Sequence, residues 1–304
     1  MKALVLTEYG RFDYKDVPEP EVHGGEVKVN VRACAICGSD VHGYDGMSGR
    51  RQPPIIMGHE AAGVISEVGE GVTDYQVGDR VTFDSTVYCG KCWYCRRGLV
   101  NLCEDRKVLG VACDEYRNPG AMAEYVAVPE RILYRLPDEV TFPQAAVVEP
   151  LSIAVHAAAV SRLKLGDRAL VVGAGTIGLL LVQVLKAAGV TELIVSDLDE
   201  GKLEIARKLG ATCTVCSAKE DLSAVVAART GGRGVDIAFE AVGLSVTLNS
   251  AIDNVRMDGS VVMVGNVSQK VDFPLQKCVT RQIRLQGSCA SSGEYDICLD
   301  MIRH

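Results

Sequence analysis

The chain has 304 residues, of which 48% are hydrophobic and 23% charged, and its formal net charge is −7. These values are ordinary for a soluble globular protein of about two domains. The acidic balance and the lack of a long basic run argue against a general binder of nucleic acid or of anionic membranes. The start, MKALVLTEYG, has no apolar stretch of signal-peptide length, and the longest uncharged run, Ala169–Leu185, is shorter than a membrane span. We therefore expect a cytoplasmic protein.

The first half of the chain, to about Val148, predicts an irregular and mostly β domain. Short runs with strand alternation, punctuated by glycine, span residues 25–33, 61–69, 78–83 and 123–128. Four side chains in or just after this half suit a metal: Cys37, His59, Glu60 and Glu149. Thiolate, imidazole and carboxylate can hold a catalytic zinc that keeps one position free for water or substrate. Their spacing alone does not bring them together.

Cysteine is abundant, with twelve residues in the chain. In a reducing compartment, metal binding or burial explains cysteines better than disulfides do. Four thiolates within fifteen residues can close a tetrahedron around a structural zinc; they are Cys89, Cys92, Cys95 and Cys103. Cys34 and Cys37 form a C-x-x-C, the pattern of a redox pair or of half a zinc site. We expect the other cysteines to be buried small apolar residues: Cys113, Cys213, Cys216, Cys278, Cys289 and Cys298.

The second half predicts a doubly wound parallel sheet. Six strand patterns, at 168–173, 191–197, 212–216, 235–241, 260–265 and 283–288, alternate with helical patterns between most of them. The clearest helices span 176–189 and 199–210 and end in glycine. A connecting helix over 149–160 has Pro150 in its first turn, where proline is favoured.

The turn after the first of these strands reads GAGTIG, a G-x-G-x-x-G from Gly173 to Gly178. It follows an apolar strand and opens an apolar helix, which is the context of a dinucleotide-binding turn. Gly173 permits the tight turn, Gly175 lets the backbone approach a pyrophosphate at the helix N-terminus, and Gly178 lets helix and strand pack closely.

Asp197 ends the next strand, about where an acidic residue receives the adenosine ribose hydroxyls. A carboxylate there disfavours a 2′-phosphate, so we expect NAD in preference to NADP. Asp199 is a better candidate than Asp197 for the cap of the following helix. Three further residues complete the predicted cofactor-binding set: Thr176, Ile177 and Lys202.

Five motifs occur in one order: ICGSDVHG, IIMGHEAAGVISEVGEGVTDYQVGDRV, the four-cysteine loop, VEPLSIAVHA and GAGTIG. Together they resemble the zinc-containing medium-chain alcohol dehydrogenases, especially the polyol branch with sorbitol (L-iditol) and galactitol-1-phosphate dehydrogenases; threonine and butanediol dehydrogenases are nearby. The resemblance runs from Met1 to about Ser288. It implies an α/β chain: a GroES-like, β-rich catalytic domain over 1–150 with a structural zinc loop at 89–103, then a Rossmann domain over 151–288 with a doubly wound parallel six-stranded sheet.

The resemblance implies that residues 289–304 begin a return to the catalytic domain, which about forty further residues would normally complete. It implies two zinc ions per chain, NAD, a small-molecule alcohol as substrate, and a homodimer or homotetramer. Cys37 and His59 match catalytic zinc ligands, and the remaining protein ligand is Glu60 or Glu149, which the sequence leaves open.

The implied reaction is the oxidation of a secondary alcohol, a polyol or a sugar-alcohol phosphate, to the ketone. Zinc would act as a Lewis acid on the alcohol, and hydride would pass to the nicotinamide. Ser39 matches the hydroxyl that contacts the substrate oxygen. His42 matches the histidine at the outer end of a proton relay that runs through the nicotinamide ribose.

Two features qualify the substrate. Sorbitol dehydrogenases carry an Arg-Tyr pair after the last Rossmann strand, whereas GSCASSGEYD has no arginine, which argues against sorbitol itself. Arg50 and Arg51 are by default a solvated pair, and the alternative is that they hold a substrate phosphate. Other functions to weigh are a non-catalytic homologue that binds NAD and zinc, an L-threonine or butanediol dehydrogenase, and a thiol redox protein that uses Cys34 and Cys37.

Overall fold

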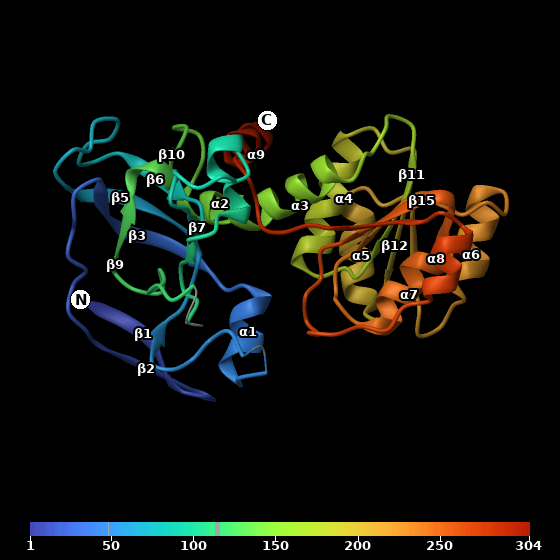
Figure 1. Cartoon of the computed structure of the whole chain (residues 1–304), viewed down its shortest axis with the longest axis horizontal. Coiled ribbons are helices and arrows are strands. Elements are labelled where there is room, and N and C mark those ends of the chain that lie inside the picture. Colours follow the sequence, from blue (N-terminus) through green and yellow to red (C-terminus); the bar gives the residue numbers. More distant parts are fainter. Residues whose placement is uncertain (48, 113–115) are drawn as a thin grey trace. The chain divides into compact units, whose positions relative to one another are not determined.

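The structure is a computed structural model that describes residues 1–47, 49–112 and 116–304, so Cys113 lies outside the described residues. The chain divides into two compact units (Figure 1). The first comprises Met1–Ser152 and Ala290–His304, and the second comprises Ile153–Cys289. The last segment therefore belongs to the first unit. Among the described residues, no helix is both long enough and apolar enough to span a bilayer.

The first unit is built mainly from antiparallel strands, as the sequence predicts. Its largest sheet has the order β10-β6-β5-β3-β9, and two small sheets have the orders β2-β1-β4 and β7-β8. The five-stranded sheet buries an apolar cluster that includes Val29, Ile65 and Phe83. The strands are β1 (Lys2–Glu8), β2 (Arg11–Asp16), β3 (Glu26–Ala35), β4 (Ile55–Ile56), β5 (Glu60–Val68), β6 (Arg80–Phe83), β7 (Thr86–Val87), β8 (Lys107–Val108), β9 (Tyr125–Pro129) and β10 (Leu133–Arg135).

Short helices join these strands, and two of them begin at capping boxes. Cys37 caps α1 (Gly38–Tyr44) together with Asp40, and Thr141 caps α2 (Phe142–Ala146) together with Gln144. The C-terminal helix α9 (Tyr295–Arg303) is held by Tyr295, which is fully buried and stacks on Tyr134 with ring centroids 4.7 Å apart. The described part of the unit also contains three 3₁₀ turns: η1 (Cys95–Arg97), η2 (Val100–Leu102) and η3 (Glu130–Ile132).

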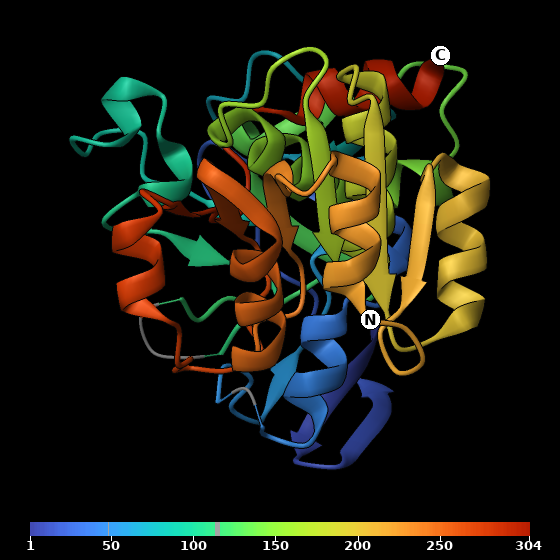
Figure 2. The same cartoon turned by 90° about the vertical axis from the view of Figure 1, so that its right-hand side faces the viewer.

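The second unit contains the predicted parallel sheet of six strands, in the order β13-β12-β11-β14-β15-β16 (Figure 2). Its strands are apolar on both faces because helices cover both sides. Helices α4 and α5 contact each other over β11 to β13, and α7 packs against β11, β14 and β15 with α6 beside it. The strands are β11 (Arg168–Val172), β12 (Glu192–Asp197), β13 (Cys213–Cys216), β14 (Val235–Glu240), β15 (Val255–Met263) and β16 (Arg284–Gly287).

The helices α3 (Val148–Val160), α4 (Thr176–Ala187), α5 (Glu200–Leu209), α6 (Leu222–Thr230), α7 (Ser245–Asn254) and α8 (Leu275–Thr280) complete the chain. Helix α5 ends at Gly210 as predicted, with φ +118°. Helix α4 ends two residues before the predicted Gly189, and β15 begins five residues earlier than its apolar run because residues around Val255 already pair with β14.

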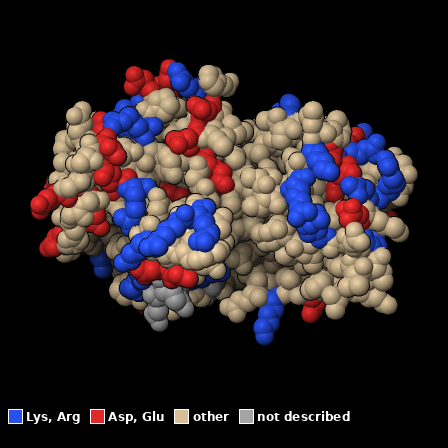
Figure 3. Space-filling view, turned by 45° about the horizontal axis from the view of Figure 1, so that its top comes forward, with Lys and Arg blue, Asp and Glu red and all other residues tan. Residues whose placement is uncertain are grey.

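Surface charge is mixed. On the face shown in Figure 3, lysines and arginines lie among aspartates and glutamates and form no continuous basic surface over the described residues. This distribution fits the acidic net charge of −7 and gives no electrostatic footprint of a nucleic-acid binder on that face.

Candidate metal centres and dinucleotide site

Cys37 lies at the turn between strand β3 and helix α1. Its backbone N–H donates to Asp40 Oδ2 at 3.2 Å, and its Sγ accepts from Ser39 N at 3.5 Å. The first turn of the helix therefore fixes the thiol. Burial, together with the nearby Glu60 carboxylate, raises the pKa of Cys37 to about 12.

The antiparallel pairing of β3 with β5 brings His59 and Glu60 to this thiol. Ala35, at the end of β3, pairs with Glu60, at the start of β5. The ligand atoms of Cys37, His59 and Glu60, here called the mixed-ligand group, all lie within 4.8 Å of one another. Both His59 and Glu60 are buried, and burial lowers the pKa of His59, which favours the neutral, metal-binding imidazole.

Glu149 occupies the first turn of α3, where the helix dipole favours a carboxylate. It is buried and accepts a hydrogen bond from Ser85 Oγ at 2.9 Å, and it is not one of the three grouped ligands. Burial and the charge of Glu60 raise the pKa of Glu149 to about 8, and burial raises the pKa of Glu60 to about 7.

The pKa shifts of Cys37, Glu60 and Glu149 indicate whether a zinc ion fits between these side chains. A thiol and two carboxyl groups stand close together in a buried place, and their mutual charge opposes ionisation. A divalent cation would reverse that effect, since it stabilises each deprotonated ligand. His59 Nδ1 is also buried without a hydrogen-bond partner among the described residues, 3.7 Å from Asp40 Oδ1. The donor set therefore fits zinc.

Ser39 and His42 stand one turn apart on α1, and both are exposed. Two neighbours were missed by the sequence reasoning. Asp40 is buried, and Arg51 is only 3% exposed, which makes the expected solvated arginine pair wrong for Arg51. The signal available in the sequence was the C-x-x-D capping box of Cys37 and Asp40. The close approach at Gly43, where a Cβ would come within 2.2 Å of Arg51 Cγ, appears only in the folded chain.

The four predicted thiols of the cysteine loop also come together. The Sγ atoms of Cys89, Cys92, Cys95 and Cys103, here called the four-cysteine group, lie within 4.8 Å of one another. Backbone N–H groups point at these sulfurs, for example Lys91 N to Cys89 Sγ at 3.5 Å and Asp105 N to Cys103 Sγ at 3.4 Å. Such donors favour thiolates: the backbone N–H of Cys95 is the main cause that lowers the pKa of Cys92 to about 6, whereas burial raises the pKa of Cys95 to about 12. The four sulfurs thus have the geometry of a closed zinc site, and a bound cation would favour the thiolate form of all four.

The other cysteines form no disulfide among the described residues. Cys34 packs against the apolar cluster of the large sheet, and burial raises its pKa to about 12, so it lacks the thiolate character of a redox cysteine. Cys216, Cys278 and Cys298 are buried, as expected, whereas Cys213 is only partly buried and packs against the core of the second unit. Cys289 is exposed, which corrects the expectation of burial; it follows the edge strand β16 and lies outside any helix or strand.

The glycine-rich turn has the geometry expected of a dinucleotide site. Gly173 has φ +101°, and a Cβ on Gly178 would come within 1.9 Å of Gly173 O, so both positions require glycine. Gly175 precedes α4 with open space around it, and no side chain caps this helix end. The first amides of α4, next to Thr176 and Ile177, are therefore free of a capping side chain and suited to a phosphate.

Of the two aspartates near the end of β12, Asp199 is the helix cap, as the sequence predicts. Asp199 caps α5 by accepting from Gly201 N at 2.7 Å and Lys202 N at 3.2 Å. Asp197 ends β12, and its Oδ2 accepts from Ala174 N, within the glycine-rich turn, at 2.6 Å. The carboxylate is thereby held at the edge of that turn. The Lys202 side chain is exposed on the first turn of α5.

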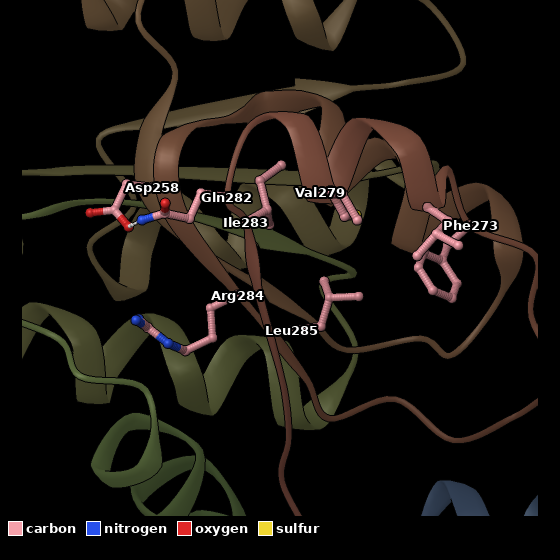
Figure 4. Close-up of a pocket in the computed structure, with 9 residues that line it drawn as sticks. Asp258, Phe273, Val279, Gln282, Ile283, Arg284 and Leu285 are labelled. Atoms are coloured by element: carbon pink, nitrogen blue, oxygen red, sulfur yellow. Dashed lines mark hydrogen bonds between the residues drawn. The ribbon is translucent and has the colours of Figure 1, made fainter.

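A hollow of about 550 Å³ lies elsewhere in the second unit and holds none of the predicted site residues. It is formed by α8 and the edge strand β16, and Figure 4 shows Phe273, Val279 and Leu285 around it, with Gln282 donating to Asp258 Oδ1 at 2.9 Å.

Comparison with known families matches both halves of the chain. Residues 23–138 match the alcohol dehydrogenase GroES-like domain, and residues 176–303 match the zinc-binding dehydrogenase family. Sorbitol dehydrogenase of Bacillus subtilis (strain 168) is 37% identical over 278 residues, which are 90% of this chain and 77% of that protein. The chain belongs to the zinc-containing alcohol dehydrogenase family. As a member of its polyol branch it is an oxidoreductase that acts on CH–OH groups.

Two further members of the zinc-containing alcohol dehydrogenase family are informative. (R,R)-butanediol dehydrogenase of Bacillus subtilis (strain 168) is 40% identical over 275 residues, 87% of this chain and 77% of that protein. A zinc-binding dehydrogenase structure from Sinorhizobium meliloti 1021, bound to NADP, has a TM-score of 0.90 at 33% identity and covers 99% of this chain and 88% of its own.

Proposed function

We propose that this enzyme uses zinc and NAD to oxidise a secondary alcohol of a polyol or sugar-alcohol phosphate to the ketone. The observation that carries the proposal is the convergence of Cys37, His59 and Glu60 at the foot of α1, the helix that carries Ser39. Three protein ligands of this kind leave a fourth position for substrate.

Cys37, His59 and Glu60 would hold the catalytic zinc, which supplies Lewis acidity that lowers the pKa of a bound alcohol. Glu149 would be the alternative carboxylate ligand; here it accepts a hydrogen bond from Ser85 Oγ, and the charge of Glu60 contributes to its raised pKa. Ser39 would accept the substrate proton as it passes its own hydroxyl proton onward, and the imidazole of His42, one turn further along α1 and exposed to solvent, would take up the relayed proton.

The dinucleotide would lie on the turn from Gly173 to Gly178 and supply the hydride acceptor. Asp197 supports NAD because its carboxylate, fixed by Ala174 N, would repel a 2′-phosphate. The similar Sinorhizobium meliloti structure is bound to NADP, so the preference of this enzyme for NAD over NADP should be measured directly.

A butanediol-type activity is the second candidate. It is favoured by the 40% identity to the butanediol dehydrogenase and by the lack of an arginine in GSCASSGEYD after β16.

NADH formation at 340 nm tests both candidates. The panel consists of sorbitol, galactitol, their phosphates, threonine and 2,3-butanediol, each with NAD and with NADP. We expect NADH from a polyol or its phosphate and faster turnover with NAD. Turnover of butanediol alone would favour the second candidate, and no NADH from any alcohol would indicate a non-catalytic homologue.

We also propose that the protein is a homodimer or homotetramer. Strand β16 is at the edge of the sheet, where a strand offers backbone groups for pairing. Exposed Phe273 and Val279 lie beside it (Figure 4), and exposed Leu275 lines the same hollow. We expect a second copy of the chain to bind here, because its own β16 could pair with this edge strand and its own apolar side chains could cover these. Sedimentation of wild-type protein and of Val279→Asp tests this: the variant should sediment as a smaller species.

A further inference from the structure

The Arg51 side chain contacts two neighbouring residues of α1, Ser39 and Asp40. Its Nη2 donates to Ser39 Oγ at 3.0 Å and lies 3.5 Å from Asp40 Oδ1. The same Asp40 oxygen lies 3.7 Å from His59 Nδ1. A single guanidinium therefore contacts the hydroxyl predicted to take the substrate proton and the carboxylate behind a predicted zinc ligand.

The fold makes room for this arginine. Its side chain crosses α1 at Gly43, where a Cβ would come within 2.2 Å of Arg51 Cγ. Only 3% of Arg51 is exposed, and burial of a charged group is costly unless it is paired. Asp40 supplies the opposite charge and is itself buried. The arrangement is thus a built feature of the helix rather than a surface contact.

The hydrogen bond to Ser39 has a consequence for proton transfer. A serine hydroxyl has two acceptor positions and one donor position. Arg51 occupies one acceptor position, because a guanidinium can only donate. One acceptor position remains for the substrate hydroxyl proton, and one O–H remains to pass a proton onward.

We propose that Arg51 is a positioning residue that orients the Ser39 hydroxyl and so fixes the direction in which the substrate proton leaves. The proposal rests on the proposed function, in which Ser39 accepts that proton. It also replaces the idea that Arg51 holds a substrate phosphate, since Ser39 and Asp40 already engage its Nη2 and the side chain is buried.

A double-mutant cycle on the zinc-loaded protein tests the proposal with Arg51→Met, Ser39→Ala and the combination. We expect Arg51→Met to lower kcat by about 10- to 100-fold, the scale of a misplaced reacting group. KM should stay within about threefold for phosphorylated and unphosphorylated polyols alike, because the buried Arg51 side chain contacts Ser39 and Asp40 and is not expected to touch the substrate. In the Ser39→Ala background the same substitution should change kcat by less than about threefold.

Two further readouts separate positioning from general damage. The solvent deuterium isotope effect on kcat should rise in Arg51→Met, because the proton step becomes slower. Arg51→Lys keeps the charge without the planar fork, so it should recover only part of kcat. If Arg51→Met does not fold because Asp40 loses its partner, Arg51→Lys replaces it in the double-mutant cycle. The expected change in kcat is then smaller. Arg50→Met, at the exposed neighbouring arginine, is the matched control and should leave kcat unchanged.

Additive effects of Arg51 and Ser39 substitutions would overturn the proposal, and so would a rise in KM confined to phosphorylated substrates. If wild-type protein oxidises no alcohol, the proposed function fails and a crystal structure of Arg51→Met decides on Arg51 separately. Ser39 in its present rotamer would then refute a positioning role, and a reoriented Ser39 hydroxyl would support it.

Discussion

The two metal-ligand groups of the first unit are built in opposite ways. The four-cysteine group comes from one loop, and its sulfurs are held by backbone N–H donors of that same loop. The mixed-ligand group joins the cap of α1 to the start of β5, so it depends on strand pairing between distant residues. Four thiolates leave a zinc ion no open position, whereas a thiol, an imidazole and a carboxylate do. On this basis we propose a structural role for the four-cysteine group and a catalytic role for the mixed-ligand group.

The largest expected effect separates the two cysteines of the C-x-x-C. Cys37→Ser should lose one of two zinc ions and lower kcat by about 10³-fold or more, since the Lewis acid is lost. Cys34→Ser should keep both ions and the activity, because Cys34 only packs against the sheet. Zinc content by mass spectrometry and NADH formation measure this. Equal damage from the two substitutions would contradict the assignment.

A second test concerns the carboxylates. Glu60→Gln should weaken zinc binding at the mixed-ligand group by about 100-fold and Glu149→Gln by about 10-fold or less, because only Glu60 lies among the grouped ligands. Competition with a chelator measures the two affinities. The reverse order would make Glu149 the resident ligand.

A substitution in the four-cysteine group should lower the stability of the protein more than its activity. Cys92→Ser should lose the other zinc ion and lower the melting temperature by about 4–8 °C, equivalent to roughly 2 kcal/mol, while residual activity stays within about tenfold. Calorimetry and limited proteolysis of residues 89–103 check this. A loss of activity as deep as that of Cys37→Ser, with the loop intact, would break the distinction between the groups.

The smallest effect is a pH dependence of the zinc-free protein. Burial raises the pKa values of Glu60 to about 7 and Glu149 to about 8, so the folded state binds more protons than the unfolded state above pH 5. Stability should therefore fall as the pH rises from 5 to 8. Zinc should remove this fall because its ligands must be deprotonated. Melting temperatures of zinc-free protein and of Glu149→Gln, whose fall should be shallower, provide the check.

Local patterns made much of this predictable. Apolar runs predict the strands of the second unit, and glycines predict its turns. The four cysteines lie in one loop, so their spacing alone predicts a zinc site. The mixed-ligand group required the family resemblance, since nothing in the spacing of Cys37 and His59 reveals that β3 pairs with β5.

Helix α1 and Arg51 show what sequence reasoning lacked. The segment GSDVHGY has glycines and small polar residues instead of an apolar stripe, so its helix depends on the capping box of Cys37 and Asp40. Arginine is rarely buried, so exposure was the natural expectation for Arg51. Its burial depends on a partner eleven residues earlier, Asp40, and on the space at Gly43, which only the folded chain reveals.

The most direct test is an anomalous difference map at the zinc edge from crystals grown with zinc and NAD. We predict two peaks per chain, one among Cys37, His59 and Glu60 and one among the four cysteines, with an open position only at the first. A single peak at the four-cysteine group, in crystals of protein that forms NADH from a polyol, would contradict the account.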